Sequence, residues 1–187
     1  NSECGVSAVN CINSAGGGDR VGMSGSETLP RYCPQRALPP YGYVPGGDWP
    51  HPTGHERGHS FGRHEISVPL DEANWRENET WLFAIDLFNH GYYWEAHEAW
   101  ESLWHACGRT GLVADLLKGL IKLAAAGVKS REGRTAGVKQ HAARAVELLS
   151  AASSQLGEQP FGLTLADIRA AAERIATSPV QSGASSQ

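Results

Sequence analysis

The residues whose types and spacing could do chemistry lie between positions 88 and 104, in the segment FNHGYYWEAHEAWESLW. At about 100° per residue of an α-helix, His97 falls in the middle of an aromatic stripe, and Glu101 follows one turn later on the same edge. The same geometry directs Glu95 nearly opposite, toward solvent. Because a buried imidazole and carboxylate need hydrogen bonds or ligands, His97 and Glu101 are either a structural pair or a functional one.

The functional interpretation is a metal site. His97-Glu98-Ala-Trp-Glu101 resembles the zinc-peptidase helix motif HExxH with its final His replaced by Glu; in that motif the end residues bind metal and the inner Glu is the base. We therefore expect His97 and Glu101 to bind a divalent transition metal (Zn, Fe or Mn), if the protein has a cofactor at all. Glu98 is the expected base, or supports the ligands, and His105 is a substitute ligand. The expected third ligand is His141, on the apolar stripe of a later helix, unless it is an edge residue.

A second group of histidines occupies a glycine- and proline-rich segment, which excludes a helix there. We interpret it as a solvated polar loop, with a metal-wrapping loop or a cover over the bundle site as the alternatives. The aromatic residues around it predict that the segment packs on the first two helices. The four histidines are His51, His55, His59 and His64.

The elements that position these residues are helices. Apolar residues recur at spacings of three and four in five segments, which predicts helices over 75–90, 93–107, 112–130, 135–155 and 165–176. The link at Gly91 is so short that the first two helices must form an antiparallel hairpin. The expected fold class is all-α, an up-and-down bundle of four to five helices in two antiparallel hairpins.

The chain divides near position 70. Eight of the ten prolines lie between Pro30 and Pro69, so residues 1–70 are expected to form an irregular arm rich in Pro, Gly and His. Residues 71–178 are the expected bundle domain, and we expect residues 1–28 and 179–187 to be disordered. Residues 1–22, which precede the only methionine, are either an upstream or processed segment or an ordinary terminus.

Composition excludes several classes of protein. With 41% hydrophobic residues the chain can build one core, and no apolar run approaches the about 18–20 residues of a membrane span. A net charge of −4 argues against nucleic acid as a partner. The cysteines are too scattered for a zinc ribbon or a disulfide framework, so we expect a reduced, cytoplasmic protein. They are Cys4, Cys11, Cys33 and Cys107.

The helical segments resemble the bacterial and archaeal family called domain of unknown function 309, over about residues 75–155. Its motif F-N-x-G-x-Y/F-x-E-x-H-E-x-x-E-x-x-W is matched by Phe88, Asn89, Gly91, Tyr93, Glu95, His97, Glu98, Glu101 and Trp104. Relatives often show Gln at Lys118 and Lys122, so this chain carries extra positive charge there. The resemblance implies a small all-helical bundle and draws attention to the His97 helix, but it implies no reaction.

Three functional hypotheses remain. The first is a metal-binding bundle that could catalyse metal-assisted hydrolysis. The second is a non-catalytic interaction or scaffold domain whose His/Glu pair is structural. Its Trp-rich helix face would receive the arm or a partner chain, including a second copy in a homo-oligomer; that face comprises Trp94, Trp100 and Trp104. The third is an anionic-ligand site at Lys118, Lys122 and Arg144, supported by charge alone.

Overall fold

The computed structural model describes residues 29–63 and 66–177, and within these ranges it is all-α without strands. Five α-helices and one 3-10 turn form the fold: α1 (Glu79–Asn89), α2 (Tyr93–Ala106), α3 (Leu112–Arg131), α4 (Thr135–Leu156), η2 (Pro160–Gly162) and α5 (Leu165–Thr177). The predicted fold class is therefore confirmed. The disorder expected for residues 1–28 and 179–187, and the interpretation of residues 1–22, concern residues outside the described ranges.

The predicted helix limits agree with the structure to within one residue, except at the start of α1. The prediction began this helix at position 75, which is wrong, because the chain turns at residues 75–77 and α1 begins at Glu79. The reason is the side chain of Asn78, which accepts a hydrogen bond from the backbone N–H of Trp81 at 3.0 Å. A cap of this kind satisfies a free amide at the helix start and fixes where the helix begins.

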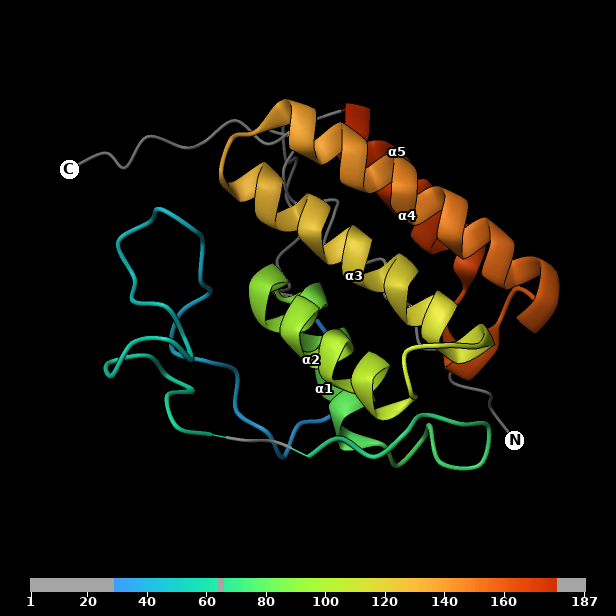
Figure 1. The fold of residues 1–187 in the computed structure, drawn as a ribbon, viewed down its shortest axis with the longest axis horizontal. Coiled ribbons are helices and arrows are strands. Elements are labelled where there is room, and N and C mark those ends of the chain that lie inside the picture. Colours follow the sequence, from blue (N-terminus) through green and yellow to red (C-terminus); the bar gives the residue numbers. More distant parts are fainter. Residues whose placement is uncertain (1–28, 64–65, 178–187) are drawn as a thin grey trace, which may run out of the picture.

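Each helix packs against its neighbour in sequence, and α3 lies between the α1–α2 hairpin and α4 (Figure 1). Gly91, at φ +83°, provides the left-handed turn that joins α1 to α2, as expected of a glycine that ends a helix. As its central place requires, α3 is buried around much of its circumference. No helix in the described part of the chain is long and apolar enough to cross a membrane.

The arm lies against the α1–α2 hairpin, where Figure 1 draws it as a blue-to-green trace. It is held by Asp86 of α1, whose carboxylate is fully buried. Asp86 accepts hydrogen bonds from Arg31 Nε at 2.8 Å, from the Tyr32 amide at 2.8 Å and from the Cys33 amide at 2.9 Å. The arm also contributes the buried Cys33 to the core. The expected packing of the arm on the first two helices is thus observed.

Candidate functional site

The structure brings together three of the site residues predicted from the sequence, all on α2. His97, Glu98 and Glu101 each offer a ligand atom, and these atoms lie within 4.8 Å of one another. The His97 ring stacks on Trp94 at a centroid distance of 6.2 Å. His97 is only partly buried, with 26% of its side chain exposed, and the two carboxylates are more exposed still. The group therefore lies at the surface edge of the helix and is open to solutes.

His97 Nδ1 is the informative atom of this group. It is buried and has no hydrogen-bond partner. It lies 3.6 Å from Glu98 Oε1 and 4.0 Å from Glu101 Oε2, which is too long for hydrogen bonds. Two ligand atoms that share a tetrahedral ion at about 2.1 Å are separated by about 3.4 Å. The distances are thus closer to those of a shared ion than to those of a hydrogen-bonded pair, so the residues fit a metal.

His141 of α4, the predicted third ligand, is half-buried but does not belong to the group of three. Burial lowers the pKa of its imidazole, and the positive charges of Lys122 and Lys129 and the nearby His97 lower that pKa further, against a smaller opposing effect of Glu132. His141 is therefore neutral near pH 7, which is the form that binds metal. His105, the substitute ligand, is exposed and packs its ring against Trp104.

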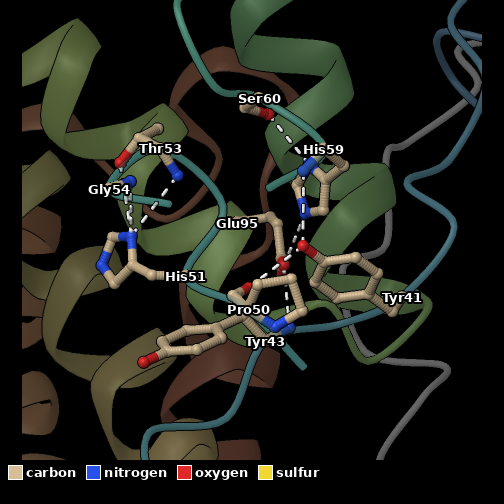
Figure 2. Close-up of polar contacts among 9 residues, drawn as sticks. All are labelled: Tyr41, Tyr43, Pro50, His51, Thr53, Gly54, His59, Ser60 and Glu95. Carbon is tan, nitrogen blue, oxygen red and sulfur yellow. Dashed lines mark hydrogen bonds and ion pairs between the residues drawn. The ribbon is translucent and has the colours of Figure 1, made fainter. Parts of the chain in front are cut away.

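Glu95 was expected to point into solvent, and this expectation is wrong. It does point away from the bundle core, but the arm covers that side of α2, so only 7% of its side chain is exposed. Glu95 Oε1 accepts hydrogen bonds from the Tyr43 amide at 2.8 Å and from His59 Nε2 at 3.2 Å (Figure 2). Helical periodicity cannot reveal a cover made by a distant segment. The available signal was the presence of Glu95 in the family motif.

His59 is the arm histidine that the sequence did not single out. Its side chain is 9% exposed, and its Nδ1 lies 2.9 Å from Ser60 Oγ. Its backbone N–H donates to Tyr41 Oη at 3.3 Å, and the Tyr41 ring meets the imidazole edge-on. Figure 2 shows Ser60 and Glu95 on opposite sides of the His59 ring.

The other arm histidines have local roles. His51 Nδ1 accepts from the backbone amides of Thr53 and Gly54, and His55 Nδ1 accepts from the amide of Arg57. Within the described ranges no arm histidine joins a group of three potential metal ligands. His64 lies outside the described residues. These hydrogen bonds are exposed, so they are compatible with the expected solvated polar loop, which stays a prediction.

A cavity of about 330 Å³ opens between the arm and the α1–α2 hairpin. His59, Ser60 and Glu95 line it together with Glu98, so the cavity extends to the edge of the His97 group. Apolar walls and arginines complete the lining; they include Phe83, Leu87, Trp94, Arg36 and Arg63. A wider cleft of about 1200 Å³ shares His59, Ser60 and both arginines. The cavity is large enough for a small organic ligand.

The Trp-rich face is partly occupied by the protein itself. Trp100 is buried in the core, and Trp94 contacts the rings of Tyr43 and His51. Trp104 remains half-exposed, with the Lys118 ammonium 5.9 Å from its ring centroid. A homo-oligomer through this face stays a prediction.

Two of the three cations of the third hypothesis form local ion pairs. Lys118 pairs with Asp115 at 3.1 Å, and Arg144 pairs with Glu147 at 2.8 Å. Each pair joins residues of a single helix, and the Arg144 pair is exposed while the Lys118 pair is half-buried. This arrangement is typical of solvated helix surfaces and gives no support to an anionic-ligand site there.

Comparison with known protein families gives a match. Residues 81–140 match the model of a family described as a domain of unknown function (DUF309). The matched region runs from α1 through α2 and α3 into the first part of α4, and so includes Glu95, His97, Glu98 and Glu101. Searches of curated proteins and of solved structures found no match.

Proposed function

We propose that the region of the chain that matches the DUF309 family, residues 81–140, binds a divalent transition metal ion through side chains of α2. The ligands are His97 and Glu101, one turn apart on the helix, with Glu98 beside them. With His141 of α4 as the third ligand, two imidazoles and one carboxylate form a donor set suited to Zn, Fe or Mn.

The observation that carries the proposal is the buried, unpartnered Nδ1 of His97 between two carboxylates. A polar atom removed from water without a hydrogen bond is unfavourable, and a metal bond would satisfy it. His141 supports the proposal because its lowered pKa supplies a second neutral imidazole on the neighbouring part of α4. We propose His141 as the further ligand, which a change of side-chain position would have to bring to the group.

The proposed chemistry is metal-assisted hydrolysis. Three protein ligands leave a coordination position for water, and a metal ion lowers the pKa of bound water. Glu98 is the most exposed of the three residues and also lines the cavity, so it is positioned to act as the general base there. In the alternative proposal the group is structural and the domain only holds the arm or a partner chain.

The decisive experiment is elemental analysis of the full chain after loading with Zn²⁺ and removal of free ion. We expect about one ion per chain and a rise in melting temperature that EDTA reverses. His97→Gln should abolish stoichiometric binding while the fold is kept. His105→Gln is the matched control, because it makes the same change on the same helix outside the group.

Two results would overturn the metal proposal. One is a wild-type chain that retains no zinc and melts at the same temperature with and without EDTA. The other is a His97→Gln variant that binds zinc as tightly as the wild type. If His97→Gln only lowers stability and no variant changes metal content, the structural interpretation of the pair is correct.

A further inference from the structure

A chain of polar contacts runs through the cavity, separate from the His97 group. Ser60 Oγ lies 2.9 Å from His59 Nδ1, and His59 Nε2 lies 3.2 Å from Glu95 Oε1. A hydroxyl, an imidazole and a carboxylate are thus connected in series (Figure 2), and all three line the 330 Å³ cavity. This is the geometric test for an activated serine: the nucleophile bonds to a base, and the base is oriented by a third group.

The carboxylate fixes the direction of these hydrogen bonds. Glu95 Oε1 already accepts from the Tyr43 amide and is the acceptor toward His59 as well, so His59 Nε2 carries a proton and donates it. In this tautomer Nδ1 is the acceptor, and the Ser60 hydroxyl donates to it. This is the tautomer in which the imidazole can take the serine proton. The buried Glu95 carboxylate also compensates the positive charge that the ring acquires.

The surrounding arm holds this arrangement in place. A Cβ on Gly58 would lie 2.2 Å from the Pro52 carbonyl oxygen, so the chain passes there only with glycine. The amide of Ser60 donates to the same carbonyl at 3.0 Å, which anchors the nucleophile's backbone. On the other side, Tyr41 stacks on Trp49 and donates its hydroxyl to the Pro50 carbonyl at 3.0 Å. A loop that is fixed by such contacts can hold side chains in place as a helix or strand does.

The cavity lining indicates the class of substrate. Phe83, Leu87 and Trp94 offer apolar walls for an alkyl or aryl group, and the volume limits the substrate to a small one. Arg36 and Arg63 supply positive charge in the same lining, and the Arg36 guanidinium lies 4.1 Å from the Phe83 ring centroid. Cationic groups stabilise the negative oxygen that develops when a carbonyl is attacked.

We propose that Ser60, His59 and Glu95 form a nucleophilic relay that hydrolyses small carboxylic esters in this cavity, independently of the proposed metal site. Ser60 Oγ bonds to the ester carbonyl carbon while its proton moves to His59 Nδ1. The ester C–O bond then breaks, and the alcohol leaves with that proton. Water attacks the acyl-serine carbon, gives a proton to His59, and the acid departs as Ser60 recovers the proton. The net reaction is ester plus water to acid plus alcohol.

The test uses the full chain, a fluorophosphonate probe and p-nitrophenyl acetate, all in EDTA. We expect the probe to form one adduct, located by peptide mass spectrometry on Ser60. Ser60→Ala should remove the adduct and lower ester turnover by at least about 10²-fold. Ser67→Ala is the matched control: Ser67 is another half-buried arm serine, and its hydroxyl pairs with Ser102 at 2.7 Å instead of with a histidine.

Glu95 acts through His59, so it is a positioning residue, and its test needs a readout that a purely structural role would not change. Glu95→Gln should change the pH profile of kcat/KM as well as its size, because an amide does not compensate the charge of the imidazolium as the carboxylate does. His59→Gln should lower turnover as much as Ser60→Ala does. Circular dichroism checks that each variant folds.

The proposal is overturned if the wild type forms no adduct, if the adduct lies on another residue, or if Ser60→Ala turns over the ester as fast as the wild type. Because EDTA is present throughout, the wild type and all variants are compared in the same metal-free state, and a difference between them is not a difference in metal content. Failure of the relay and failure of the metal site are therefore distinguished: the first appears in Ser60 labelling, and the second in zinc content.

Discussion

Replacing Asp86 with alanine tests how strongly the arm is bound to the bundle. The carboxylate is fully buried and accepts three hydrogen bonds. In Asp86→Ala two backbone amides and the Arg31 guanidinium therefore lose this acceptor. Breaking a buried ion pair by removing one partner costs about 3–5 kcal/mol. Arg31 keeps the carbonyls of Cys33 and Arg36 as acceptors and is 22% exposed. We therefore expect the free energy of unfolding to fall by an amount near the lower limit of this range, about 3 kcal/mol.

Asp86→Asn should not rescue this loss. Oδ2 accepts from both Arg31 Nε and the Cys33 amide, while Oδ1 accepts from the Tyr32 amide. An asparagine that keeps its oxygen toward Tyr32 directs an NH₂ group at two donors. Both substitutions should therefore free the first residues of the arm.

The assay is urea unfolding combined with amide hydrogen exchange at residues 31–36. With a typical slope of about 2 kcal/mol/M, a loss of about 3 kcal/mol lowers the urea midpoint by about 1.5 M. Glu147→Ala is the control, because it breaks an exposed ion pair with Arg144 and should cost at most about 0.5 kcal/mol. The reasoning is refuted if Asp86→Ala costs less than about 1 kcal/mol and leaves exchange in the arm unchanged.

Three further predictions concern packing, pH and thiol chemistry. A Cβ on Gly127 would lie 2.6 Å from Tyr93 Cγ, so Gly127→Ala should destabilise the α2–α3 contact by about 1–3 kcal/mol in thermal melts; an unchanged melting temperature would contradict this contact. Burial, together with nearby positive charge, lowers the pKa of His141 below 6.5 in the folded protein, so the unfolded chain binds the proton more readily. Its contribution to stability is present above pH 6.5 and lost as the pH falls through the lowered value, and His141→Gln should flatten that part of the stability–pH curve measured by urea unfolding; equal slopes would count against it. Burial, with the charge of Glu79, raises the pKa of the Cys33 thiol, so iodoacetamide should modify Cys107 faster than Cys33 in peptide maps of the native protein, and the reverse order would be inconsistent with the core.

The helices could be predicted because each carries its own periodic signal. Trp81, Ile85 and Phe88 recur at spacings of four and three in the first helix, and all three are buried in the core. The same helical geometry, about 100° per residue, correctly placed His97 and Glu101 on one edge of α2. These are short-range consequences of 3.6 residues per turn, which sequence reports directly.

The covered polar residues could not be predicted in this way. Glu95 faces away from the bundle. That side of α2 is buried because the arm covers it, and the arm residue Tyr43, which binds Glu95, lies 52 positions earlier in the sequence. The spacing of the arm histidines likewise contains no periodic signal that separates the buried His59 from the locally bonded His55. Irregular segments are positioned by contacts with distant residues, which a local pattern does not contain. Asp86 was missed for the same reason.

The burial of Asp86 and Glu95 under the arm has a practical consequence for anyone shortening this protein. The region matched to DUF309 starts at residue 81, yet the groups that neutralise or hydrogen-bond these two acids come from residues 31–59. A fragment trimmed to the helices would gain two hydrated negative charges and a bare apolar strip along the first hairpin. Recombinant versions should therefore begin no later than residue 29. A shorter version is expected to aggregate more and to be less soluble than the full chain.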